Sequence, residues 1–268
     1  MNDIIAAART LLFVPGHRPD RFDKAAGSGA DLVVLDLEDA VAPDQKDTAR
    51  EHARTWLAAG NRAVVRINPA GTPWHDQDLT AVSGLATALM VPKAECADQI
   101  GAVAARAPRA GIIPLIETAA GVTRAVAVCS AAAVVRPAFG SVDLAAQLGI
   151  DHRSHEALRH ARSALVLATA AAGCGAPIDG VTTALDDEAA LQADLDHAAT
   201  LGFTGKLCVH PRQVEQANTA FTPSDDELRW AQRVLAAGAD GAVASLDGQM
   251  IDRPVLLRAE AIVRQAQR

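Results

Sequence analysis

Acidic residues crowd the end of one apolar run in this sequence. The segment LDLEDAV at 35–41 places Asp36, Glu38 and Asp39 within four positions, directly after a β-branched run and shortly before Pro43. Such a run predicts a buried strand that ends in a polar mouth. Carboxylates this close repel one another unless a cation, basic side chains or solvent offset them. The segment is therefore a candidate metal site.

Glu117 and Asp143 follow the fifth and sixth apolar runs, so their carboxylates are expected to converge on one cation. Oxygen ligands without nearby His or Cys favour Mg²⁺, with Mn²⁺ as the alternative, over Zn²⁺. Glu38 and Asp39 are then expected to hold water molecules around the metal. Other polar residues follow corresponding runs, which indicates one shared site: His17, Arg18, Asn68, Lys93, Glu95, Thr118 and His210.

Arg66 follows the third apolar run and brings a fixed positive charge with planar donors. Such a group suits a substrate carboxylate or an oxyanion that develops during a reaction. The alternative is a salt bridge from Arg66 to Glu38 or Asp39 that only closes the mouth.

The apolar runs alternate with helix-length amphipathic stretches. Strands are predicted over 10–14, 32–36, 63–67, 88–91, 112–116, 134–139, 177–181 and 206–209, and helices over 19–28, 45–59, 97–105, 121–129, 155–172 and 187–201. This alternation predicts an α/β fold, a (β/α)8 TIM barrel with a short C-terminal helical arm. A doubly wound open sheet is the alternative, although no Gly-x-Gly-x-x-Gly follows the first strand.

The pattern changes after the eighth strand, which divides the chain into a catalytic barrel over 1–223 and an extension over 224–268. The Ser-x-x-Glu pattern of Ser224 and Glu227 predicts a capped helix that runs to about residue 237. A Gly-rich link over 238–248 and a last helix over 255–267 follow. The extension is too short to fold alone and is expected to dock on the barrel or on a neighbouring subunit.

Composition excludes several classes of protein. Half of the 268 residues are hydrophobic and the net charge is −7, which argues against disorder and against nucleic-acid binding. The four cysteines lack zinc or disulfide spacing. The N-terminus has no basic leader, and apolar runs stop short of membrane-spanning length. We therefore expect a cytoplasmic protein without membrane segments.

The ordered motifs of this chain resemble the citrate lyase β-subunit-like (CitE-like) family. They are LLFVPG at 11–16, LDLEDAV at 35–41, RIN at 66–68, PK at 92–93, IET at 116–118, FGSVDL at 139–144, GKLCVHP at 205–211 and MID at 250–252. The resemblance implies a Mg²⁺-dependent carbon–carbon lyase that cleaves a 3-hydroxyacyl-CoA thioester of malyl, citramalyl or citryl type. Acetyl-CoA and a keto acid would be the products.

The resemblance also implies roles for individual residues. Glu117 and Asp143 would bind the metal, Arg66 would contact substrate, and Asp252 would be the catalytic acid/base in a homotrimer or higher homo-oligomer. Glu38 and Asp39 would support metal-bound waters, Lys24 and Lys93 would contact the CoA thioester, and Lys206 and His210 also match family positions. Arg253 departs from the smaller or apolar residue that often follows the aspartate.

Alternative functions remain open at this stage. One is the β-subunit of a citrate lyase complex that depends on an acyl carrier protein. Others are a malate-synthase-like condensing enzyme, a 2-keto-acid aldolase and a non-enzymatic scaffold.

Overall fold

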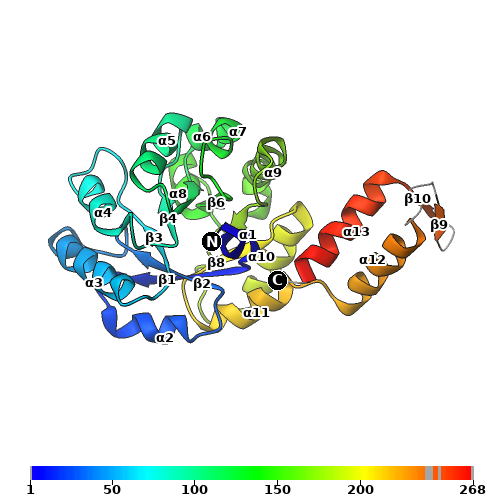
Figure 1. Cartoon of the computed structure of the whole chain (residues 1–268), viewed down its shortest axis with the longest axis horizontal. Helices are drawn as coiled ribbons and strands as arrows, with labels where there is room; N and C mark the ends of the chain where they lie inside the picture. The colour runs from blue at the N-terminus through cyan, green and yellow to red at the C-terminus, as the bar shows by residue number, and fades with distance from the viewer. Residues whose placement is uncertain (1, 239–243, 247–248, 267–268) are drawn as a thin grey trace. The chain divides into compact units, whose positions relative to one another are not determined.

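The computed structural model describes residues 2–238, 244–246 and 249–266 and divides into two compact units, 1–218 and 219–268. The first unit contains a closed barrel of eight parallel strands in sequential order, ringed by helices (Figure 1). The strands are β1 Thr10–Pro15, β2 Leu32–Asp36, β3 Val64–Arg66, β4 Ala88–Val91, β5 Gly111–Ile116, β6 Ala138–Phe139, β7 Ile178–Asp179 and β8 Gly205–Cys208. The predicted (β/α)8 barrel is confirmed, and the open-sheet alternative is wrong.

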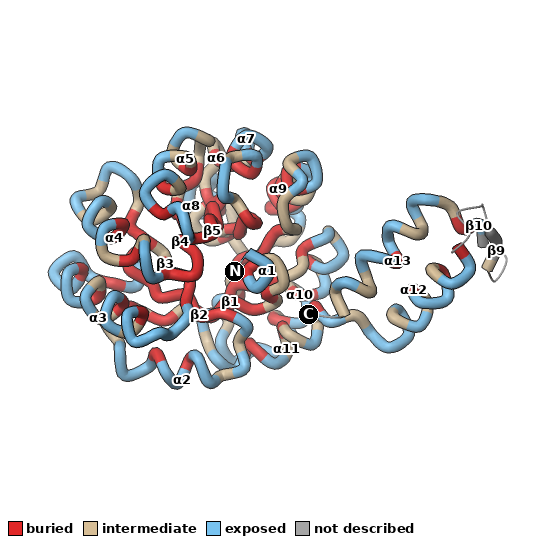
Figure 2. The backbone as a smooth tube through the Cα atoms, in the orientation of Figure 1, coloured by how far each residue is buried: buried red, intermediate tan, exposed pale blue. Residues whose placement is uncertain are grey.

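The strands are buried on both faces, as their apolar runs predict. In Figure 2 the buried residues follow the strands and the inner faces of the helices, while the outer helix faces are exposed. Side chains such as Leu11, Val34, Met90, Ile113 and Leu207 fill one shared core. Because this core draws on most strands, it fixes where the strand ends lie.

Each of the six predicted helices overlaps a helix of the structure, but the first unit contains more helices than were predicted. The surrounding helices are α1 Asn2–Ala7, α2 Phe22–Ala26, α3 Lys46–Ala58, α4 His75–Val82, α5 Ala97–Arg106, α6 Ala119–Thr123, α7 Ala125–Cys129, α8 Ser141–Leu148, α9 His155–Ala172, α10 Glu188–Leu201 and α11 Arg212–Ala220. Four helices, α1, α4, α8 and α11, were not predicted from the sequence. The single helix predicted over 121–129 is two helices, α6 and α7, which meet at the non-helical Arg124.

The second unit is a helical hairpin closed by a small sheet. Its elements are α12 Asp225–Ala237, β9 Ala244–Leu246, β10 Gln249–Ile251 and α13 Arg253–Ala266. The predicted capping box at Ser224 is present, and Ala231, Val234, Ile251 and Ala259 form the core. The predicted link over 238–248 contains strand β9, which pairs with β10. Positions 239–243 and 247–248 of this link, and position 267 of the predicted last helix, lie outside the described residues. The barrel boundary at residue 223 stays a prediction.

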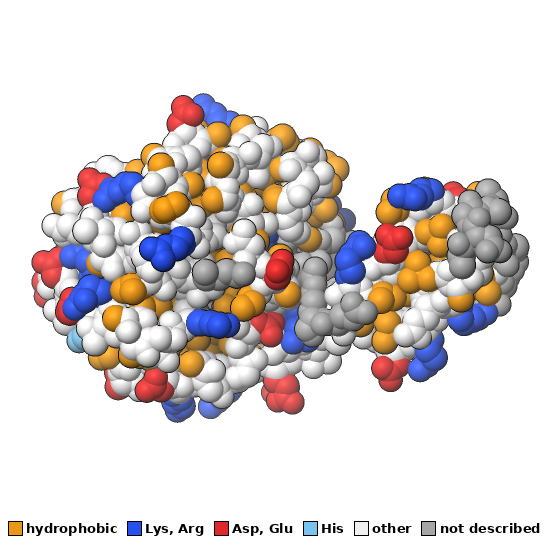
Figure 3. Space-filling model, in the orientation of Figure 1, with side chains coloured by type: hydrophobic (Ala, Val, Ile, Leu, Met, Phe, Trp, Pro, Cys, Tyr) orange, Lys and Arg blue, Asp and Glu red, His pale blue; other side chains and the backbone are white. Residues whose placement is uncertain are grey.

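Charged surface groups of both signs are interspersed on the visible face of the first unit (Figure 3). Among the described residues, no helix is both long and apolar enough to cross a membrane.

A buried ion cluster joins the last two strands of the barrel. The carboxylate of Asp179 accepts hydrogen bonds from Arg162 Nε at 2.8 Å and from Lys206 Nζ at 2.9 Å, and all three side chains are almost completely buried. Burial alone would raise the pKa of Asp179, but Lys206 and Arg162 outweigh it and hold that pKa below its usual range. The cluster stabilises the barrel through a carboxylate that stays ionised.

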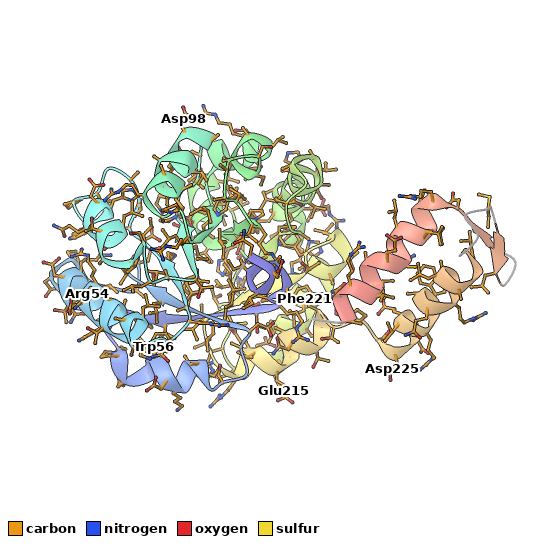
Figure 4. All side chains as sticks on the ribbon, in the orientation of Figure 1. Arg54, Trp56, Asp98, Glu215, Phe221 and Asp225 are labelled. Atoms are coloured by element: carbon orange, nitrogen blue, oxygen red, sulfur yellow. The ribbon has the colours of Figure 1, made fainter. Side chains whose placement is uncertain are left out.

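We predict that Asp179→Asn lowers the free energy of unfolding at pH 7 by about 3–5 kcal/mol, because two buried cations lose their counter-charge. The stabilisation is full above the unfolded pKa, about 3.9, and is lost as pH falls through the lower folded value. Wild type and variant should therefore converge in acid, which urea unfolding across pH will measure. Glu51→Gln is the control, since the exposed Glu51 pairs with Arg54, which Figure 4 labels on α3. An equally stable Asp179→Asn protein would contradict this account.

Candidate active site

The C-terminal ends of β2 and β3 form a charged pair because of their register. Asp36 lies opposite Arg66, and Arg66 Nε and Nη2 donate to the two Asp36 oxygens at 2.8 and 2.7 Å. Arg66 Nη1 lies 3.1 Å from Glu38 Oε2 and 3.5 Å from Asp39 Oδ2. Burial alone would lower the pKa of Arg66, but Asp36 and the other carboxylates raise it. The salt-bridge alternative for Arg66 is therefore present in the structure, and its contact with substrate stays a prediction.

The loop after β2 is held by a buried lysine, Lys46, which was not predicted as a site residue. Lys46 Nζ donates to the carbonyl oxygens of Leu37 and Glu38 and to Asn68 Oδ1, each at 2.7 Å. Asn68 in turn donates to Asp78. These contacts fix the backbone that carries Glu38, so that its carboxylate has a defined position.

Three more predicted residues meet Glu38 at the same end of the barrel. Lys93 Nζ, after β4, lies 3.3 Å from Asp143 Oδ1, 3.6 Å from Glu117 Oε1 and 3.8 Å from Glu38 Oε1. Glu117 follows β5, while Asp143 lies in the first turn of α8 rather than in a loop after β6. The structure therefore brings Glu38, Arg66, Lys93, Glu117 and Asp143 together.

Burial disfavours the charged forms of two of these carboxylates. It raises the pKa of Glu38 to about 8, assisted by Glu117 and Asp39 and opposed by Arg66 and Lys93. It raises the pKa of Glu117 to about 7, with Asp143 adding to the rise and Lys93 opposing it. The cations present in the chain do not fully offset the cost of burying these acids.

A divalent cation fits this arrangement. Glu38 Oε2 is buried and accepts no hydrogen bond, although Arg66 Nη1 is close enough for an ion pair. Within the described ranges, no three His, Cys, Asp or Glu side chains form a ready cage, so the protein offers an incomplete set of oxygen ligands. Mg²⁺ is usually bound by one or two carboxylates and keeps several waters. Glu117 and Asp143 would hold such an ion, with Glu38 nearby.

Gly140 leaves the room that Glu117 occupies. Ile116 pairs with Phe139, so Glu117 and Gly140 follow neighbouring positions of β5 and β6. A Cβ on residue 140 would lie 2.3 Å from Glu117 Cβ and 2.7 Å from Oε2. The FGSVDL motif contained Gly140, but only the strand register reveals why a side chain is not accommodated there.

Lys24 lines a cavity of about 400 Å³. Phe13, Pro15, Arg21 and His210 also line this cavity, from β1, the segment after it and the turn after β8. A lining that combines apolar residues with basic side chains suits an anionic ligand that has an apolar part. Lys206, in contrast, is buried in the Asp179 cluster, so its side chain supports the barrel.

Asp252 belongs to the second unit. Its Oδ1 accepts a hydrogen bond from the N–H of Val255 at 3.2 Å, which caps the first turn of α13. Its predicted catalytic role stays a prediction, as does any effect of the neighbouring Arg253.

Comparison with known proteins agrees with this fold. The chain matches the HpcH/HpaI aldolase/citrate lyase family over residues 9–211. It therefore belongs to that family, and the sequence resemblance to its CitE-like members is confirmed.

Individual relatives are similar over nearly their whole length. The chain is 41% identical to the citrate lyase subunit beta-like protein of Mycobacterium tuberculosis H37Rv, covering 97% of this chain and 96% of that protein. It is 35% identical to a (3S)-malyl-CoA thioesterase of Cereibacter sphaeroides, with 95% of each covered. It is 34% identical to the L-malyl-CoA/beta-methylmalyl-CoA lyase of Rhodobacter capsulatus, covering 97% of this chain and 94% of the lyase.

A solved structure gives the same result. The crystal structure of M. tuberculosis CitE in complex with magnesium, acetoacetate and coenzyme A superposes with a TM-score of 0.83 at 38% identity, covering 98% of this chain and 99% of the other.

We predict that Gly140→Ala displaces the Glu117 carboxylate and costs about 1–3 kcal/mol of unfolding free energy, because the new methyl group has no space. Thermal unfolding of the purified variant measures the effect. Gly84→Ala is the matched control, since a Cβ there would meet nothing within 4 Å. Equal unfolding temperatures for the two variants would show that the residues around position 140 can move to accommodate the methyl group without loss of stability.

Proposed function

We propose that this chain is a Mg²⁺-dependent carbon–carbon lyase that cleaves a 3-hydroxyacyl-CoA thioester of malyl, citramalyl or citryl type by a retro-Claisen reaction. The observation that carries the proposal is the set of Glu38, Arg66, Lys93, Glu117 and Asp143 at the C-terminal strand ends, where catalysis occurs in such barrels. Membership of a family with malyl-CoA lyases supports it.

The reaction breaks the bond between the carbinol carbon and the carbon next to the thioester. The hydroxyl loses its proton as the carbinol becomes the keto group, and the bonding electrons pass to the thioester enolate. Protonation of that enolate carbon then gives acetyl-CoA. A bound Mg²⁺ would hold and polarise the oxygens of the keto-acid part.

The chain's own residues divide the remaining work. Asp36 fixes the plane of the Arg66 guanidinium through two hydrogen bonds, so Arg66 presents a positive charge with little freedom to move. A preorganised donor of this kind commonly lowers a barrier by about 3–4 kcal/mol. The cavity beside Lys24 and Arg21 would take the CoA part, with basic side chains facing its phosphates. Asp252 would supply the proton to the enolate carbon.

The direct test assays malyl-, methylmalyl-, citramalyl- and citryl-CoA for release of keto acid. We expect Asp143→Asn to retain the fold but to bind Mg²⁺ far more weakly by calorimetry, with activity lost in parallel, because one of two carboxylate ligands is gone. Unchanged Mg²⁺ affinity would remove Asp143 from the site.

The same assay separates the competing functions. Hydrolysis of malyl-CoA to malate and CoA, without keto acid, would support a thioesterase, the activity by which one relative is named. Activity only on a thioester of an acyl carrier protein would support the citrate lyase subunit. Condensation without measurable cleavage would support the malate-synthase-like alternative.

We also propose that the enzyme is a homo-oligomer, most simply a trimer, in which Asp252 completes the site of a neighbouring subunit. Met250 and Leu257, on either side of Asp252, are large apolar side chains exposed to 63% and 45%. Such residues on a small helical unit favour contact with another surface.

A cytoplasmic location stays a prediction, supported by four free cysteines.

We predict that inactive Asp252→Ala and Glu117→Ala chains regain activity when mixed under conditions of subunit exchange. In a random mixture about a quarter of the sites formed between subunits would contain both intact residues. Keto-acid release measures the recovery, and mixing each variant with itself is the control. No recovery despite demonstrated exchange would place Asp252 in its own subunit's site or outside catalysis.

A further inference from the structure

Lys93 holds an unusual position for a surface-reaching lysine. Its ammonium lies between 3.3 and 3.8 Å from three carboxylates, those of Asp143, Glu117 and Glu38. Two of these acids are almost completely buried, whereas the Lys93 side chain is 42% exposed. The Lys93 side chain is therefore accessible to solvent, although two of its three acidic partners are not.

The backbone at Lys93 is specialised for this position. Its φ of 47° lies in the left-handed region, which few residues other than glycine adopt. Its N–H donates to Glu117 Oε1 at 2.8 Å, and the next N–H, of Ala94, donates to the carbonyl of Leu115. These bonds offset the strain and tie the base of the lysine to the Glu117 carboxylate. The main chain therefore remains in place whichever way the side chain points.

We propose that the Lys93 ammonium is a built-in counter-cation, which holds the carboxylates together without metal and moves outward when a divalent cation binds. The inference rests on the proposed function and adds that Lys93 sets how tightly the site binds Mg²⁺. Mg²⁺ bonds to oxygen at 2.0–2.1 Å and carries twice the charge of the ammonium. An ammonium beside the same oxygens would then be repelled.

The side chain is suited to such a movement. Lysine carries a compact charge on a flexible four-carbon stem and makes no planar, two-pronged pairing that would anchor it. The hydrogen bond from the Lys93 ammonium to Asp143 Oδ1 is long at 3.3 Å. Arg66 differs, because two short bonds to Asp36 hold it. Of these two cations, Lys93 is therefore the one that a metal ion can displace.

The test titrates Mg²⁺ into wild type, Lys93→Met and Lys93→Arg and follows binding by calorimetry. We expect Lys93→Met to bind Mg²⁺ at least roughly fivefold more tightly than wild type does. This is the effect of removing the repulsion between a unit positive charge and a divalent cation about 8 Å away in water-like surroundings. The gain should shrink as salt is added. Lys93→Arg keeps the charge and should show no gain. Equal or weaker binding by Lys93→Met would overturn the inference.

Without metal, Lys93→Met should unfold at a lower temperature than wild type, and saturating Mg²⁺ should remove the difference. If the variant does not fold, the inference can be tested on the wild-type protein. Its lysine amines are labelled by reductive methylation, and the labelling is measured by mass spectrometry. Mg²⁺ should raise labelling of Lys93 severalfold and leave Lys24 unchanged. Unchanged or reduced labelling of Lys93 would overturn the inference.

The outcomes also separate this inference from the function on which it rests. If neither wild type nor Lys93→Met binds Mg²⁺, the proposed magnesium site is wrong. If wild type binds Mg²⁺ and Lys93→Met binds it no more tightly, only the role of Lys93 is wrong.

Discussion

Mutual repulsion of buried carboxylates is the constraint on which the C-terminal end of the barrel depends. Asp36, Glu38 and Glu117 all lie where water is largely excluded, so their charges need partners within the protein. Asp36 has a full partner in Arg66, whereas burial still raises the pKa of Glu38 and Glu117. The site is therefore organised but not electrically complete, which is the condition that a cation ligand would relieve.

Strand register determines where the charged side chains of the barrel lie. Register alone sets Asp36 beside Arg66, and it sets the position after Ile116 beside Gly140. The apolar core beneath these positions prevents a strand from shifting, because a shift of one residue would exchange the side chains inside the barrel with those that face the helices. The geometry of the charges thus follows from the packing of the apolar runs.

The sequence reveals the strands well because strands buried on both faces leave continuous apolar runs. It reveals less where Pro137 limits pairing, so β6 is shorter than predicted, and where a polar motif opens α8 at Ser141. Acids at strand ends were found from their spacing alone. The roles of Lys46 and Gly140 could not be found, because each depends on which backbone atoms lie opposite in space.

Two ion clusters in the same barrel differ in how completely their carboxylates are paired and buried. At Asp179 two cations meet one carboxylate, both its oxygens accept hydrogen bonds, and all three side chains are closed to solvent. At Glu38 one oxygen accepts no hydrogen bond, and the nearby Lys93 reaches solvent. The Asp179 cluster leaves no carboxylate oxygen without a hydrogen bond, so it holds the strands, although Arg162 Nη1 is buried without a hydrogen-bond partner. Glu38 and Glu117 have free energy to gain from a bound cation, so the incomplete charge compensation at these strand ends supports the proposed metal site.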